Sequence, residues 1–132
     1  MFVGLTGSAG CGKSVVLKCF EKLGWFCLDT DKICHELYES RNQKIVTEFQ
    51  KRWESLAFVD GTEVNKKFIA GKVFKDRVEL RWLESVVHPL ILDTIKNKLI
   101  TNTNPHVLID APLIYEVDIW NNIFDVVICV LS

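Results

Sequence analysis

The sequence predicts an α/β fold in which a parallel sheet is flanked by helices. Four short apolar runs alternate with helical patterns, as such a sheet requires. Two of the runs, at about 106–109 and 125–131, are almost continuously apolar, which is typical of strands covered on both faces. A glycine-rich turn directly follows the first run and precedes the first helical pattern. Together these observations favour a parallel sheet over an antiparallel one.

We expect the elements in the following order. The first strand covers about 2–6, the first helix about 13–23, and the second strand 25–28, ending at Asp29. The third strand covers 106–109 and ends at Asp110, and the fourth covers 125–131. The chain shows no repeat, low-complexity tract or linker, so its length predicts one domain over 1–132.

A long helical region separates the second and third strands. From Arg77 to Ile100, apolar residues recur at a spacing close to the helical period. Pro89 interrupts this stretch, and we expect it to mark a break or a first turn. The turn signal at 102–105 ends the region.

Composition narrows the class of protein. A net charge of -1 gives no general basic surface for nucleic acid or an anionic membrane. No run is long enough to span a bilayer, and no basic segment followed by an apolar run opens the chain. The five cysteines include no Cys-x-x-Cys pair, which favours reduced thiols over disulfides or a metal site. We therefore expect a soluble, cytoplasmic protein without nucleic-acid or membrane partners.

The turn between the first strand and helix has the spacing of a phosphate-binding loop, Gly-x-x-x-x-Gly-Lys-Ser. Glycines let the backbone turn its N–H groups toward an anion, and the following helix directs its positive end there. Lys13 adds a charge for the outer phosphates, and the Ser14 hydroxyl can hold Mg²⁺. The alternative, a turn that only joins strand to helix, is disfavoured by this context. The predicted nucleotide-binding residues are Gly7, Ser8, Ala9, Gly10, Cys11, Gly12, Lys13, Ser14 and Val15.

Acidic residues follow the second strand, where the carboxyl ends of parallel strands form a ligand crevice. Asp29 and Asp31 both lie there. Either carboxylate could instead cap the next helix, and for Asp29 this alternative is left open. Asp31 is the better candidate to orient a substrate hydroxyl or accept its proton. His88-Pro89, the segment from Asp110 to Glu116, and the turn at 60–62 are weak signals when taken singly.

Taken together, these segments resemble the dephospho-coenzyme A kinase family. The motifs that carry the resemblance agree in order and spacing: Gly4–Ser14, Asp29-Thr30-Asp31 with His35, Val73-Phe74, Leu83-Glu84, His88-Pro89-Leu90-Ile91, and Pro112-Leu113-Ile114-Tyr115-Glu116.

The resemblance implies a P-loop nucleotide kinase fold with a helical substrate-binding insertion at about 31–104. It implies transfer of phosphate from ATP, with Mg²⁺, to the ribose 3′-hydroxyl of dephospho-coenzyme A, the last step of coenzyme A biosynthesis. Asp31 and Lys13 match catalytic positions of the family, and Ser14 matches the Mg²⁺ ligand. The implied substrate-binding residues are Asp31, His35, Lys66, His88, Pro112 and Glu116.

The chain departs from the family pattern in three places. Val15 stands where threonine is usual, and Lys66 stands where the family carries an arginine, which can grip phosphate bidentately. The family also continues beyond the fourth strand with an arginine-bearing lid, whereas this sequence ends at Ser132. We therefore expect an N-terminal fragment or shortened product that binds ATP weakly, transfers phosphate slowly and self-associates through the uncovered strand 126–131.

Two alternatives stay open: another small-molecule P-loop kinase, and a fragment that binds nucleotide without transferring phosphate. A GTPase is disfavoured, because Asn65-Lys66-Lys67-Phe68 lacks the aspartate of the guanine-recognition motif and follows no apolar strand.

Overall fold

The computed structural model describes residues 1–7, 12–61, 63–111 and 124–130. The chain divides into two compact units. We call Met1–Asp31 with Ile95–Ser132 the sheet unit, and Lys32–Thr94 the helical unit.

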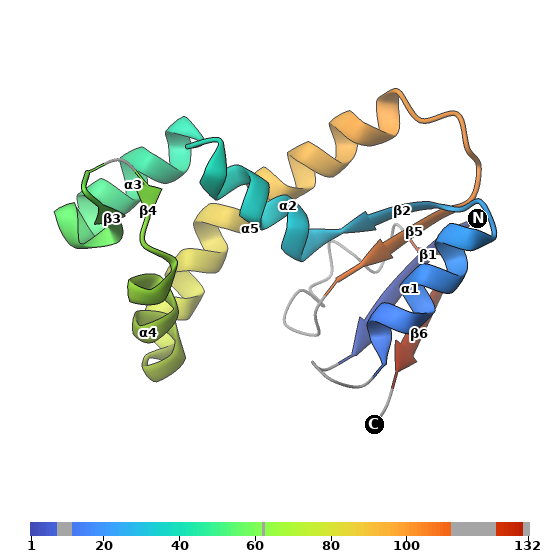
Figure 1. The fold of residues 1–132 in the computed structure, drawn as a ribbon, viewed down its shortest axis with the longest axis horizontal. Helices are drawn as coiled ribbons and strands as arrows, with labels where there is room; N and C mark the ends of the chain where they lie inside the picture. The colour runs from blue at the N-terminus through green and yellow to red at the C-terminus, as the bar shows by residue number, and fades with distance from the viewer. Residues whose placement is uncertain (8–11, 62, 112–123, 131–132) are drawn as a thin grey trace. The chain divides into compact units, whose positions relative to one another are not determined.

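The sheet unit is built on four parallel strands, which Figure 1 shows side by side. They are β1 (Phe2–Gly7), β2 (Phe26–Asp29), β5 (Val107–Asp110) and β6 (Val126–Val130). Their spatial order is β2-β5-β1-β6, so β5 pairs with both β2 and β1. The predicted parallel sheet is confirmed, and each strand lies within a residue or two of its expected position.

The register of β5 aligns the strand ends. Asp110 is opposite Leu5 of β1 and Asp29 of β2. Residues from the carboxyl ends of strands that are distant in the sequence therefore meet at one edge of the sheet.

Helix α1 (Lys13–Lys22) follows β1 and packs on the sheet (Figure 1). Its buried Leu17 lies in one core cluster with Val3, Leu5 and Leu108. This apolar contact stabilises the short helix and fixes the direction of its first turn.

The helical unit contains α3 (Gln43–Trp53), the short 3-10 helix η1 (Glu54–Ala57) and α4 (Lys66–Lys75). Helices α2 (Thr30–Glu39) and α5 (Arg77–Ile100) have residues in both units. Between η1 and α4 lies a hairpin of β3 (Phe58–Val59) and β4 (Glu63–Val64), which the sequence analysis had not predicted. The core of this unit centres on Ile45 and Phe49, both fully buried.

The expected break at Pro89 is wrong, because α5 continues through it. Proline cannot donate a backbone hydrogen bond and disfavours a helix interior. Val86, Val87 and Ile91 are nevertheless buried on either side of it. The burial of these side chains favours a continuous helix by more than the missing hydrogen bond disfavours it.

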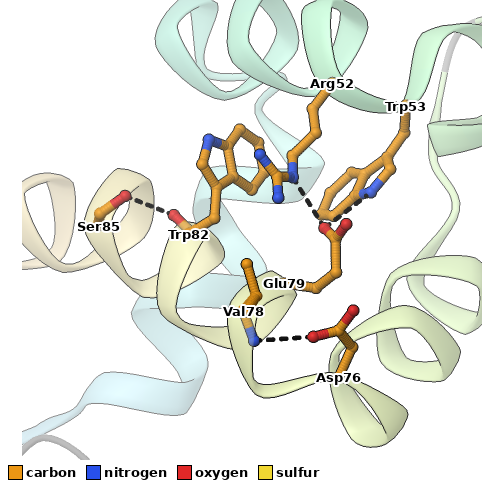
Figure 2. A network of polar contacts seen from close by, with 7 residues as sticks. All are labelled: Arg52, Trp53, Asp76, Val78, Glu79, Trp82 and Ser85. Atoms are coloured by element: carbon orange, nitrogen blue, oxygen red, sulfur yellow. Dashed lines mark hydrogen bonds and ion pairs between the residues drawn. The ribbon is translucent and has the colours of Figure 1, made fainter.

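A polar cluster within the helical unit joins α3 to α5 (Figure 2). Glu79 accepts hydrogen bonds from Arg52 Nε at 2.8 Å and from the Trp53 indole N–H at 3.2 Å. The Arg52 guanidinium lies 4.6 Å from the centre of the Trp82 ring, which packs edge-on against Trp53. Glu79 therefore satisfies two donors at once in a mostly apolar contact.

Two further predictions concern the surface. Strand β6 lies at one edge of the described sheet, with Val126 and Val127 44% and 51% exposed, in agreement with the expected apolar edge. Among the described residues, no helix is both long and apolar enough to cross a membrane.

Candidate functional site

The phosphate-binding sequence joins β1 to α1, as the motif requires. Gly7 ends β1, and Gly12 occupies the position before α1 with a φ of 89°. This left-handed conformation is costly for a residue with a side chain, which explains the glycine at position 12. The Gly12 carbonyl accepts the first helical hydrogen bond, from Val15 N–H at 3.1 Å. The predicted residues Ser8, Ala9, Gly10 and Cys11 lie outside the described residues.

Lys13, the first residue of α1, is paired with a carboxylate in this structure. Its Nζ lies 2.9 Å from Oδ1 of Asp110, at the end of β5. Both side chains are largely buried, with exposed fractions of 16% for Lys13 and 9% for Asp110. The strand order β5-β1 produces this contact, since it places the end of β5 beside the strand that leads into α1.

Burial raises the pKa of the Asp110 carboxyl above its ordinary value. The hydrogen bond and charge of Lys13 lower this pKa, and the charges of Asp29 and Asp31 raise it further. Because desolvation is the largest effect, Lys13 compensates only partly for the cost of burying the carboxylate. The edge of the sheet therefore holds a concentrated negative charge beside one ammonium group.

The two acids after β2 have different surroundings. Asp29 caps α2, since its Oδ1 accepts a hydrogen bond from the Asp31 N–H at 2.9 Å. Asp29 therefore has the helix-capping role that was left open as an alternative. Asp31 is exposed in the first turn of α2. Thr30 between them is buried and donates its hydroxyl hydrogen to the Asp110 carbonyl at 2.9 Å, which ties the end of β2 to that of β5.

Ser14 and Val15 are exposed in the first turn of α1. A hydroxyl in this position can reach a ligand at the helix N-terminus, where the unpaired N–H groups favour an anion. Val15 offers no such group. The Thr6 hydroxyl, one residue before the loop, is buried and has no hydrogen-bond partner among the described residues.

The structure brings together Lys13 and Asp31 with two residues that the sequence analysis gave no role, Asp110 and Thr30. The signal for Asp110 was present in the sequence, since it ends a buried strand. Its partner could not be predicted, because the contact depends on which strands are neighbours.

The remaining predicted site residues fall into two sets. His35, Lys66 and His88 belong to the helical unit, and Pro112 and Glu116 lie outside the described residues. His35 and Lys66 are exposed on α2 and α4. His88 is half-buried within α5, and this burial lowers its pKa to about 4, so the imidazole is neutral at pH 7.

Comparison with known proteins agrees with the family that the sequence motifs resemble. The family model described as "Dephospho-CoA kinase" matches residues 1–132. The dephospho-CoA kinase of Legionella pneumophila strain Paris is 36% identical over 114 residues, which are 86% of this chain and 56% of the relative. That of Gamma-proteobacterium EBAC31A08 is 32% identical over 130 residues, which are 98% of this chain and 65% of the relative.

Two solved structures share the fold. The crystal structure of TT1252 from Thermus thermophilus matches with a TM-score of 0.80 and 28% identity, over 98% of this chain and 64% of that chain. Dephospho-CoA kinase from Campylobacter jejuni matches with a TM-score of 0.71 and 22% identity, over 96% of this chain and 64% of that chain. The chain thus spans somewhat less than two thirds of the length of these relatives.

Proposed function

Because this chain belongs to the dephospho-CoA kinase family, we propose that it transfers the γ-phosphoryl group of ATP to the ribose 3′-hydroxyl of dephospho-coenzyme A. This reaction would complete the synthesis of coenzyme A. The observation that carries the proposal is the meeting of Lys13, at the start of α1, with acids from the ends of β2 and β5. From the same edge of one sheet, Lys13 would bind phosphate and Asp31 would act on the acceptor.

Lys13 would interact with the transferred phosphoryl group. Its ammonium would leave or share Asp110 when ATP binds, and it would follow the phosphoryl group as charge moves toward the leaving ADP. Before nucleotide binds, the Lys13 ammonium is paired with Asp110, and this carboxylate would compete with the phosphates for it. Gly12 and the N–H groups of the first turn of α1 would hold the phosphates.

The residues present also fit Mg²⁺. In the described ranges, no three His, Cys, Asp or Glu side chains form a group that could hold a metal ion. Mg²⁺ is usually bound by one or two protein oxygens together with substrate phosphates and water. The exposed Ser14 hydroxyl would supply such an oxygen. When bound, Mg²⁺ neutralises charge on the phosphate oxygens.

Asp31 would act on the acceptor. Asp29 makes the cap of α2, so the exposed carboxylate of Asp31 is available to a substrate hydroxyl. In the transfer, a bond forms between the acceptor oxygen and the γ-phosphorus, and the bond from that phosphorus to the ADP oxygen breaks. The hydroxyl proton passes to Asp31 and then to solvent.

We place substrate contacts in the helical unit at His35, Lys66 and His88, and further along the chain at Pro112 and Glu116. The support is the exposed position of His35 and Lys66, and the family motif for the others. A neutral His88 can donate or accept a hydrogen bond but attracts no phosphate by charge.

A single-turnover assay tests the proposal. The 132-residue chain in excess is mixed with dephospho-coenzyme A, ATP and Mg²⁺, and coenzyme A is identified by its mass. We expect coenzyme A to form, with ADP in equal amount. Binding of ATP without formation of coenzyme A would reject the proposal in favour of a nucleotide-binding fragment, and phosphorylation of another small alcohol alone would favour a different kinase.

Three variants assign the roles. Lys13→Ala should lower the transfer rate by about a hundredfold or more. Asp31→Asn should lower that rate by about 10²–10⁴-fold with little change in ATP affinity. Asp29→Asn is the matched control, because asparagine caps a helix as well as aspartate and the rate should stay within a few-fold of wild type. Equal effects of the two asparagine variants would remove the catalytic role of Asp31.

We also propose that the chain associates with a second copy through β6. The exposed Val126 and Val127 on this edge strand support the proposal. Light scattering should give a mass that rises with concentration for the wild type and stays constant for Val127→Lys. A constant monomer mass for both chains would contradict it.

A further inference from the structure

The helical unit contains a cavity that the transfer chemistry does not use. Its volume is about 560 Å³. Small-molecule sites commonly have volumes of about 300–1,000 Å³, so this cavity can hold part of an extended ligand. It is lined by Tyr38, Glu39, Arg41, Glu63, Val64 and Lys66.

Several contacts fix the walls of the cavity. Val64 is buried and pairs with Phe58 across the β3–β4 hairpin. The next residue, Asn65, caps α4 through a hydrogen bond that its side chain accepts from the Phe68 N–H. Its own N–H donates to the Ala57 carbonyl at 2.7 Å. The hairpin and the start of α4 are thus held in place without any ligand.

Arg41 lines the cavity from an unusual backbone position. It follows α2 with a φ of 54°, and its N–H donates to the Tyr38 carbonyl at 3.1 Å. The Asn42 N–H donates to the Leu37 carbonyl at 3.1 Å, which completes a Schellman motif. Glycine is the usual residue at the left-handed position of this motif, and a side chain there destabilises the fold.

Among the described residues, no polar interaction of the Arg41 side chain offsets this destabilisation. It makes no hydrogen bond or ion pair with any residue that the structure describes. A strained residue whose charged group lines a cavity is a candidate for ligand binding.

The charges around the cavity indicate which kind of ligand fits. Arg41 and Lys66 are balanced by Glu39 and Glu63, and Lys66 already lies 3.7 Å from Glu39. A balanced set of donors and acceptors attracts an isolated phosphate weakly, but it can hydrogen-bond amide groups of both polarities. Tyr38 and Val64 add apolar surface, and the Tyr38 ring lies 5.9 Å from that of Phe49.

We infer that this cavity binds the pantetheine arm of dephospho-coenzyme A. The arm is uncharged, carries two amides and a hydroxyl, and has a dimethyl-substituted carbon. Its amide N–H groups suit the carboxylates, its carbonyls suit Arg41 and Lys66, and its methyl groups suit Tyr38 and Val64. The inference rests on the proposed function. In that reaction the ribose hydroxyl of dephospho-coenzyme A accepts the phosphate, and the pantetheine arm of the same molecule would be bound by this cavity.

Arg41→Gly tests the inference, because glycine removes the side chain and suits the left-handed backbone. Isothermal titration of the whole chain compares dephospho-coenzyme A with ADP, which lacks the arm. We expect Arg41→Gly to bind dephospho-coenzyme A tenfold or more weakly, to bind ADP as the wild type does, and to melt at the same or a higher temperature. Glu54→Gly is the matched control, since Glu54 also has a φ of 54° but does not line the cavity.

The control should leave the affinity for both ligands unchanged. In an NMR titration with pantetheine alone, the backbone amide signals of Arg41 and Lys66 should shift. Unchanged affinity of Arg41→Gly for dephospho-coenzyme A, or an equal loss for ADP, would overturn the inference, as would pantetheine shifts confined to other residues. Failure of phosphoryl transfer with the Arg41 effect intact would instead reject the proposed reaction and keep the binding site.

Discussion

Replacing Glu79 by alanine should destabilise the helical unit by an amount that follows from its two hydrogen bonds. The indole N–H of Trp53 would lose its acceptor inside a contact where Trp53 is only 6% exposed. An unsatisfied buried donor costs about 1–3 kcal/mol. The Arg52 ion pair adds less, about 0.5–1 kcal/mol, because the Arg52 side chain is 30% exposed and can be hydrated.

The expected loss in the free energy of unfolding for Glu79→Ala is therefore about 1.5–4 kcal/mol. Glu79→Gln keeps an oxygen for the Trp53 N–H and loses only the charge, so it should lose about 1 kcal/mol or less. Arg52 should remain over the Trp82 ring in both variants, since that contact does not need Glu79 (Figure 2).

Urea unfolding, followed by circular dichroism and tryptophan fluorescence, measures these losses. With a slope of about 1–3 kcal/mol per molar urea, the midpoint of Glu79→Ala should fall by about 0.5 M or more. Glu36→Ala is the control, because Glu36 is an exposed glutamate on α2, and its midpoint should scarcely change. In a Trp53→Phe background, which lacks the indole N–H, Glu79→Ala should cost about 1 kcal/mol less. The reasoning is refuted if Glu79→Ala stays within 0.5 kcal/mol (about the noise of additive sites) of Glu36→Ala.

Three further predictions concern other parts of the chain. Gly4→Ala should lower the unfolding free energy by about 1–3 kcal/mol, because a Cβ there would lie 2.8 Å from the Phe124 ring; urea unfolding measures this. The free energy of unfolding should fall as pH drops from 6.5 toward 4, because His88 takes up a proton in the unfolded chain at a higher pH than in the folded chain. The loss is on the order of 1–2 kcal/mol for this half-buried group, and urea unfolding at several pH values should show a smaller loss for His88→Gln. Asp110→Asn should lower the melting temperature, because it leaves the largely buried Lys13 ammonium without its charged partner, and it should tighten ATP binding without Mg²⁺ about tenfold by releasing Lys13, as titration calorimetry would measure.

Each of these has a matched control or a contrary outcome. Gly71→Ala lies in α4, where an added Cβ meets no atom within 4 Å, and should stabilise the chain slightly. A parallel pH dependence of wild type and His88→Gln would show that other groups set the acid stability. Weaker binding of Mg²⁺-free ATP by Asp110→Asn would show that the carboxylate positions Lys13 for phosphate rather than competing with it.

Local features of this protein could be predicted from its amino-acid sequence. The spacing from Gly7 to Ser14, between an apolar run and a helical pattern, predicted the start of α1 because a helix start depends on neighbouring residues. The four strands were predicted for the same reason, since each contains a short apolar run. Pro89 was misjudged because its local preference against a helix interior is outweighed by the burial of side chains around it.

Which of these elements are neighbours became evident only from the folded structure. The order β2-β5-β1-β6 places β5 between β2 and β1, and this brings Asp110 to Lys13 and ties Thr30 to the end of β5. The same limit applies to the cavity, whose walls come from the end of α2, from β4 and from the start of α4. A backbone strand can pair with any other strand, so its partner is chosen by packing across the whole sheet. The spacing of residues along one segment therefore does not predict which strands will pair.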